Sequence, residues 1–250
     1  MSSIATSSIV FAWVFGGALL GMMLRAAIPR DHLIGDSKEA VRVGMGLVVS
    51  MTAIVLGMLV SSAKKSYDTQ SAEVTQMSAK IVVLDRVLAH YGPEGEDTRR
   101  VLHVVVTRLI DQIWSNDLSN FSKVSWFAEA NALFDKIQEL SPKDDEQRSL
   151  RAEALSLSMS IGETRWLMYH QRLSSVSMTL IIVLVFWLSI IFIGFGLFAP
   201  SNATAIASLC VSAFSVSSAI LLILDMYSPY TGLVRISNAP MRAALANLGQ

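Results

Sequence analysis

The alternation of apolar and polar positions divides the chain into four long uncharged stretches and one polar region between the second and third. The stretches cover residues 4–24, 43–63, 173–199 and 201–224, and none contains Asp, Glu, Lys, Arg or His. A helix rises 1.5 Å per residue, so about 20 apolar residues cross a hydrocarbon core of about 30 Å. The pattern therefore predicts four transmembrane helices.

The first stretch has two interpretations, a permanent span or a cleaved signal peptide. A signal peptide begins with a basic segment, whereas residues 1–8 contain no Lys or Arg. We therefore expect a permanent span. The third and fourth stretches are separated by little more than Pro200 and Asn202, which predicts a tight helical hairpin, because proline cannot continue a helix without losing a backbone bond.

Residues 64–172 are polar on average, yet their apolar positions recur at steps of three and four. The first series is Val74, Met77, Ile81, Leu84, Leu88 and Tyr91. Such spacing is typical of an amphipathic helix. We expect this helix to continue the second span outward by about 25 to 30 residues and to end at Gly92-Pro93.

Three further helices are predicted in the same region, and no segment alternates as a half-buried strand would. They begin near Asp97, at Ala128 after a connection over 114–125, and near Asp144, where the last helix is expected to run into the third span. The two long helices that leave and re-enter the membrane should pack antiparallel as a stalk.

The predicted fold class is thus all-α: an integral membrane protein with four transmembrane helices and a helical cytoplasmic insert between the second and third spans. The predicted domains are a first transmembrane hairpin (1–63), the helical insert (64–172), a second transmembrane hairpin (173–224) and a cytoplasmic tail (225–250). Orientation follows from Lys and Arg near the membrane. The excess of basic residues on the insert side favours a cytoplasmic insert. That side has six, Lys64, Lys65, Arg165, Arg172, Arg235 and Arg242, and the opposite side has four, Arg25, Arg30, Lys38 and Arg42.

Composition excludes several classes of partner and chemistry. Hydrophobic residues make up 52% and charged residues 16%, and 20 basic and 20 acidic residues cancel without any long basic run, so nucleic acid is not an expected partner. The single cysteine, Cys210, permits no intrachain disulfide. The four histidines are scattered and no nucleotide or hydrolase motif is present, so we expect no metal, no cofactor and no enzymatic activity.

Two membrane stretches carry candidate functional faces. In the second, Gly46, Ser50, Ala53 and Gly57 fall at i, i+4, i+7 and i+11, a stripe of small residues that would either pack closely on a neighbouring helix or leave room for ions along a pore. In the fourth, one helix face carries four serines, Ser208, Ser212, Ser215 and Ser218. Their hydroxyls must either donate to helix carbonyls or line a water-filled space. Gly17 and Gly21 form a GxxxG pair that favours helix packing.

Three segments resemble the bestrophin-like membrane protein family, whose members are widespread in bacteria. The first is Leu84-Asp85-Arg86 with Tyr91-Gly92-Pro93, the second runs from Arg108 to Trp114, and the third from Leu224 to Ile236. The order of parts, two spans, a helical insert, two spans and a short tail, also matches this family. The motif residues to which we assign structural roles are Asp85, Arg86, Tyr91, Gly92, Pro93, Asp225, Pro229, Gly232 and Arg235.

Charge and turn chemistry suggest what three of these residues do. A carboxylate at the C-terminal end of a helix is unfavourable without a partner, so we expect Asp225 either to bind a basic residue of the insert or tail, or to lie solvated at the interface. Pro229 and Gly232 are expected to form a turn that directs the tail along the membrane surface.

The resemblance implies an oligomeric ion channel in a bacterial inner membrane. Bestrophins are oligomeric anion channels whose second span lines the pore with an aromatic constriction, whereas residues 43–63 contain no Phe, Tyr or Trp. The absence of ionisable groups in the spans disfavours coupled transport, and four helices enclose too little space for a pore within one subunit. The expected partners are the lipid bilayer, further copies of this chain and inorganic ions. The alternative is a non-conducting membrane scaffold or sensor whose helical domain binds a cytoplasmic protein.

Overall fold

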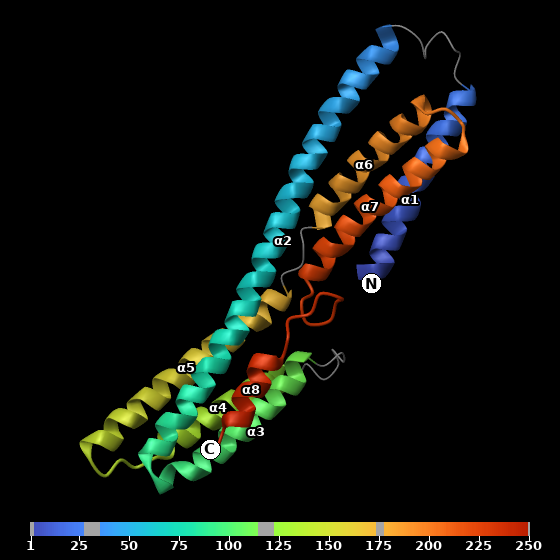
Figure 1. Ribbon diagram of the computed structural model, residues 1–250. Helices are drawn as coiled ribbons and strands as arrows, with labels where there is room; N and C mark the ends of the chain where they lie inside the picture. Colours follow the sequence, from blue (N-terminus) through green and yellow to red (C-terminus); the bar gives the residue numbers. More distant parts are fainter. Residues whose placement is uncertain (1–2, 28–35, 115–122, 174–177, 250) are drawn as a thin grey trace. The chain divides into compact units, whose positions relative to one another are not determined.

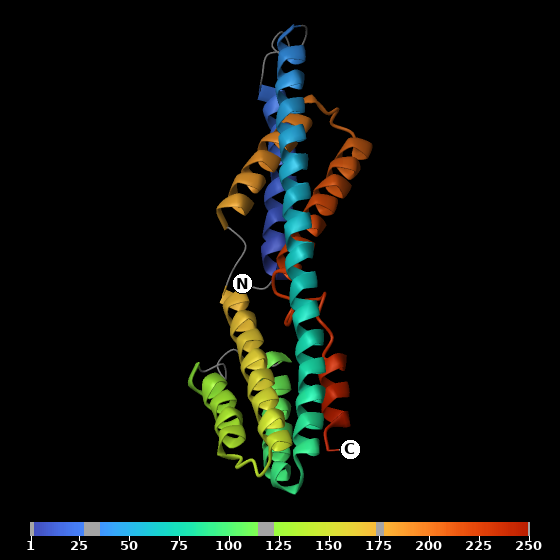
Figure 2. The same ribbon diagram turned by 90° about the vertical axis from the view of Figure 1, so that its left-hand side faces the viewer.

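The computed structural model describes residues 3–27, 36–114, 123–173 and 178–249, and all of its regular structure is helical (Figures 1 and 2). The elements are α1 (Ser3–Ala27), α2 (Asp36–Tyr91), the short 3₁₀ helix η2 (Pro93–Gly95), α3 (Glu96–Trp114), α4 (Lys123–Glu139), α5 (Asp145–Leu173), α6 (Met178–Phe198), α7 (Ala203–Met226) and α8 (Ala239–Asn247). The prediction of an all-helical protein is confirmed for the described residues.

Four of these helices, α1, α2, α6 and α7, are long and apolar enough to cross a membrane. Helix α2 does not end where its apolar stretch ends. It continues through the amphipathic series to Tyr91, as its spacing predicted.

The chain forms two compact units, to each of which α2 contributes one part. The membrane unit comprises residues 1–66, 175–228 and 232–234, and the insert unit comprises residues 67–174, 229–231 and 235–250. Each unit has its own apolar core.

Within the membrane unit, α1 runs parallel to α6 and antiparallel to α7. Gly17 of α1 faces Ser189 and Ile193 of α6, and Gly21, one turn later, faces Ile193 and Leu197. Against α7 the order reverses, since Ser7 donates a hydrogen bond to the Ser217 carbonyl (2.7 Å) whereas Phe11 contacts Phe214. A Cβ added at Gly21 would collide with the Ile193 carbonyl, so the predicted packing role of the GxxxG pair is confirmed.

Replacing Gly21 by alanine should therefore destabilise the membrane unit. The added methyl group meets backbone rather than a movable side chain, so α1 and α6 must separate, at a cost of about 1–3 kcal/mol. Thermal unfolding in detergent would show a lower midpoint. Gly16→Ala is the matched control, because a Cβ at Gly16 has no neighbour within 4 Å. Equal midpoints for the two variants would contradict this account of the helix contact.

The turn between α6 and α7 is closed by Asn202. Its side chain accepts a hydrogen bond from the Ala205 N–H (2.9 Å) and so caps the first turn of α7, while Pro200 follows the end of α6. Arg25 at the end of α1 donates to the carbonyl of Ala199 in the same turn.

Within the insert unit, the later part of α2 packs antiparallel to α5. The hydrogen bonds between them include three whose residue numbers rise along α2 as they fall along α5: Gln171 to Glu73 (2.9 Å), Lys80 to Ser160 (2.7 Å) and Gln147 to the carbonyl of Tyr91 (3.0 Å). The predicted antiparallel stalk is therefore confirmed in this unit. Its apolar core includes the buried face of α2 named in the sequence analysis (Val74, Met77, Ile81, Leu84, Leu88, Tyr91).

Several predicted details differ from the structure or lie outside it. Helix α4 begins at Lys123 rather than Ala128, and most of the expected connection before it, like the expected continuity of α5 with the third span at 174–177, lies outside the described residues. Of the tail, α8 packs in the insert unit, where Met241 and Ala244 are buried in the core.

Candidate functional site

The membrane part of α2 has three distinct faces, of which one packs inside the subunit. Val48, Val55 and Leu59 contact the apolar core of the membrane unit, and Thr52 is buried with its hydroxyl donating to the Val48 carbonyl (2.7 Å). At about 100° per residue, the small-residue stripe is centred about 160° around the helix from this packed face.

The small-residue stripe is left open within the subunit. Gly46, Ser50, Ala53 and Gly57 are all exposed, and a Cβ added at Gly46 or Gly57 would have no neighbour within 4 Å. Ser50 donates its hydroxyl to the Gly46 carbonyl (2.9 Å), so the one polar side chain of the stripe is already satisfied by its own helix. The stripe is thus available to something outside the subunit.

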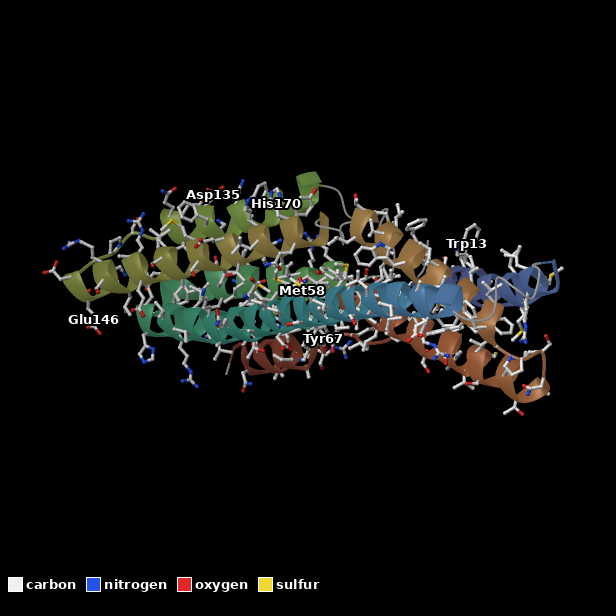
Figure 3. All side chains as sticks on the ribbon, turned by 90° about the horizontal axis from the view of Figure 1, so that it is seen from above. Trp13, Met58, Tyr67, Asp135, Glu146 and His170 are labelled. Carbon is white, nitrogen blue, oxygen red and sulfur yellow. The ribbon has the colours of Figure 1, made fainter. Side chains whose placement is uncertain are left out.

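The third face of α2 carries large apolar side chains. Val43, Ile54 and Met58 are 70%, 64% and 68% exposed, and Met58 is labelled on this helix in Figure 3. Large exposed apolar side chains in a membrane span require lipid or a neighbouring subunit as their environment.

The serine face of α7 is also turned away from the core of the membrane unit. Ser208, Ser212 and Ser215 are exposed and Ser218 is half-buried. Three of the four hydroxyls donate to the carbonyl four residues earlier, at 2.8–2.9 Å: Ser212 to Ser208, Ser215 to Val211 and Ser218 to Phe214. No hydrogen bond of the described residues joins this face to the stripe of α2.

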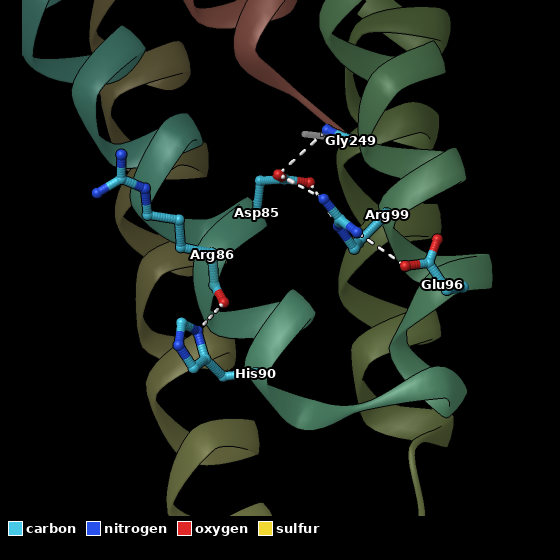
Figure 4. Close-up of polar contacts among 6 residues, drawn as sticks. All are labelled: Asp85, Arg86, His90, Glu96, Arg99 and Gly249. Atoms are coloured by element: carbon cyan, nitrogen blue, oxygen red, sulfur yellow. Dashed lines mark hydrogen bonds and ion pairs between the residues drawn. The ribbon is translucent and has the colours of Figure 1, made fainter.

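The first family-like motif contains a buried ion pair in the insert unit (Figure 4). The Asp85 carboxylate receives two hydrogen bonds from the Arg99 guanidinium, Nε to Oδ1 at 2.9 Å and Nη2 to Oδ2 at 3.0 Å, and a longer one from the Gly249 N–H at 3.3 Å. Bidentate pairing of this kind is among the strongest ionic contacts in proteins. Hydrogen bonding to Asp85 raises the pKa of Arg99 above its ordinary value, so the guanidinium stays charged.

Sequence reasoning named Asp85 but missed Arg99. Asp85 stands seven residues before Gly92 and Arg99 seven residues after it. Two antiparallel helices joined by a turn bring positions equally distant from the turn together, and this symmetry is the signal that could have found the pair. The side chain of the adjacent Arg86 is exposed instead. Figure 4 shows a hydrogen bond between the backbone carbonyl of Arg86 and the Nδ1 of His90 (2.8 Å).

The reversal itself is made by Tyr91, Gly92 and Pro93. Gly92 has φ = +106°, a region that side chains avoid, and Pro93 begins η2. The Tyr91 side chain is buried in the insert core, and its carbonyl accepts from Gln147 of α5 (3.0 Å). The turn is therefore held between three helices.

The second and third family-like motifs meet in the insert unit. Trp114, the last residue of α3, donates its indole N–H to the Ile236 carbonyl (2.8 Å) and packs edge to face on Tyr230, with ring centroids 5.9 Å apart. Pro229 is buried and its carbonyl accepts from the Ile236 N–H (2.8 Å), while Arg235 is exposed and donates to the Thr231 carbonyl (3.3 Å). These residues close a loop over the end of α3.

Asp225 has a partner, but not the basic residue that the sequence led us to expect. The side chain is buried, at 3% exposure, and its carboxylate accepts from the backbone N–H of Val234 (2.6 Å), so it is not solvated either. A Cβ at Gly232 would collide with the same carboxylate. A main-chain donor satisfies the charge here, and the loop can approach only because residue 232 has no side chain.

Replacing Gly232 by alanine should therefore open this loop. The methyl group would force the Asp225 carboxylate away from the Val234 N–H and leave a buried carboxylate without its donor, at a cost of about 1–3 kcal/mol. Limited proteolysis within 226–238 should become faster. Leu233→Ala is the control, because this neighbouring side chain is 70% exposed; if it accelerates cleavage as much as Gly232→Ala does, the close approach at Asp225 is not the cause.

The described residues contain no group of three or more His, Cys, Asp or Glu side chains placed to hold a metal ion. The candidate functional faces are therefore the open stripe of α2 and the serine face of α7. The motif residues instead make the contacts that hold together the insert unit and the Asp225 loop.

Comparison with known proteins identifies the family of this chain and a protein of similar fold. Residues 12–241 match the bestrophin-like domain family, so the chain belongs to that family. The fold is similar to that of a bacterial bestrophin homologue from Klebsiella pneumoniae, a single-residue variant, with a TM-score of 0.69 over 96% of each chain at 12% identity. No protein among the curated sequences matches significantly.

Proposed function

We propose that this protein is an ion channel of the bestrophin type, passive and anion-preferring, whose pore forms between identical subunits. The observation that carries the proposal is the small-residue stripe of α2. Gly46, Ser50, Ala53 and Gly57 lie on a membrane span yet are exposed, and no described residue lies within 4 Å of a Cβ added at either glycine. The family and the fold, shared with a bacterial bestrophin homologue, support a channel.

The shape of α2 supports an oligomer. One face packs on the subunit's own helices, one carries small side chains, and one carries large apolar side chains. Cyclic symmetry would place the small face on the axis, where short side chains leave space for ions, and would leave the large face to lipid or the neighbouring subunit. Four helices of one subunit are too few to surround an aqueous path themselves, because side chains fill the core of such a bundle.

A passive mechanism is consistent with the spans, since none contains Asp, Glu, Lys, Arg or His with which to couple flux to protons. Anion preference is the expectation from the family resemblance; the stripe adds no carboxylate that would repel anions. With the insert and both termini cytoplasmic, residues 64–172 would extend a vestibule below an inner-membrane pore.

Reconstitution tests the proposal. The full-length protein in liposomes loaded with chloride should release the anion faster than protein-free liposomes, and replacing chloride by gluconate should slow release. The release of chloride and of sodium at matched gradients measures preference. If the oligomeric protein shows no flux of either ion under varied calcium, pH and voltage, the channel proposal fails, and the scaffold or sensor alternative replaces it.

A further inference from the structure

A cavity of about 380 Å³ lies within the membrane unit, between α2, α6 and α7. Its walls are mainly apolar and come from Met45 of α2, Phe195 and Phe198 of α6, and Leu209 of α7. Two polar side chains also line it, Arg42 and Ser208. Its size is that of a site for a small organic molecule or for a segment of a larger one.

The position of the cavity along the spans marks the depth at which hydrocarbon gives way to headgroups. Arg42 is the last charged residue before the uncharged stretch 43–63, and Phe198 is the last residue of α6 before the turn. A cation that directly flanks the end of an apolar span is a residue that proteins place at the headgroup level of a bilayer.

Within the described part of the chain, the cation of this cavity has no partner. No hydrogen bond or ion pair of the Arg42 guanidinium occurs among the described residues, although Glu39 lies three residues earlier on the same helix. The nearby Arg25, by contrast, donates to the Ala199 carbonyl. The Ser208 hydroxyl, on the opposite wall, likewise has no protein partner in the described part of the chain. A guanidinium and a hydroxyl beside an apolar wall are complementary to a phosphate that carries a hydrocarbon chain.

We propose that this cavity binds one anionic phospholipid per subunit, with the headgroup phosphate on Arg42 and Ser208 and part of an acyl chain against Phe195, Phe198 and Leu209. The cavity is too small for a whole lipid, so the rest of the molecule remains in the bilayer. The site does not depend on ion conduction, and its test does not measure flux.

Native mass spectrometry of the purified oligomer tests the site. The full-length protein is incubated with equal amounts of phosphatidylglycerol and phosphatidylcholine of identical acyl chains, and the lipids retained per subunit are counted. The wild-type protein should retain phosphatidylglycerol preferentially, at about one molecule per subunit. Arg42→Gln should reduce this preference about fivefold, the effect of removing one interfacial cation.

Two further variants separate the cavity from general attraction to charge. Ala205→Phe fills the cavity and keeps Arg42, so it should lose retained lipid of both kinds. Lys65→Gln removes an exposed cation from the other end of the same apolar stretch and should bind as the wild type does. Excess inorganic phosphate should leave the bound lipid in place, because phosphate makes no contact with the apolar walls.

Any of the following results would overturn the proposal: equal retention of the two lipids by the wild type, undiminished preference in Arg42→Gln, equal losses in Arg42→Gln and Lys65→Gln, or full lipid retention in Ala205→Phe. Displacement of the lipid by phosphate alone would also overturn it. The thermal midpoint of each variant oligomer, measured beside its lipid count, excludes unfolding as the cause of a loss.

Discussion

Replacing Gly57 by tryptophan should abolish ion flux while leaving the fold and the oligomer intact. In the structure a Cβ at Gly57 meets nothing within 4 Å, so the subunit itself tolerates a larger side chain at this position. In the proposed channel, however, cyclic symmetry brings one copy of the new indole from every subunit to the axis. A ring of bulky apolar groups there closes the path by volume and by dewetting. Flux from liposomes, normalised to the amount of oligomer, measures the effect.

Two variants make this result specific to the stripe. Gly57→Ala adds one methyl group and should conduct nearly as the wild type does. Ile182→Trp places the same indole side chain at a different exposed position, on α6, where the wild-type side chain is 63% exposed, and should also conduct. If Gly57→Trp conducts normally as an intact oligomer, the stripe does not line the path. If Ile182→Trp blocks as well, the loss reflects disturbed packing rather than a plug.

The stripe illustrates how much of the candidate site could be predicted from the sequence. The spacing of Gly46, Ser50, Ala53 and Gly57 placed four small residues on one face of a span, because helix periodicity is a local property. Whether that face packs inside the subunit is not local, since it depends on which neighbours α1, α6 and α7 present. The structure supplies this answer, with the packed face carried by Val48, Thr52 and Leu59.

The motif residues show the same limit. Asp225 was expected either to bind a basic residue or to lie solvated, because a carboxylate at a helix C-terminus is unfavourable without a partner. The partner is the Val234 N–H, which every sequence position except proline could offer, so no residue type could identify it in advance. The tail likewise packs through Met241 and Ala244. Two apolar residues on so short a helix are too few to form a pattern that predicts a docking site.

The buried ion pair between Asp85 and Arg99 should be the most sensitive point of the insert unit. Only 5% of the Asp85 side chain and 11% of the Arg99 side chain are exposed. Arg99→Met would keep the apolar stem but leave the carboxylate in the protein interior with only the distant Gly249 N–H. Removal of one partner of a buried pair costs about 3–5 kcal/mol, because the remaining charge is desolvated and uncompensated. The thermal midpoint, followed by helical circular dichroism in detergent, should fall markedly.

The neighbouring Arg100 gives a matched control, because its ion pair with Asp97 is exposed and Arg100→Met should leave the midpoint close to that of the wild type. The double variant Asp85→Leu with Arg99→Met removes both charges and should recover most of the loss. Pairing raises the pKa of Arg99, so its contribution is complete below the ordinary pKa of arginine and is lost only at higher pH. The defect of Arg99→Met should therefore be equally large at neutral and mildly alkaline pH. A double variant no more stable than Arg99→Met would show that lost packing, rather than an unpaired carboxylate, weakens the unit.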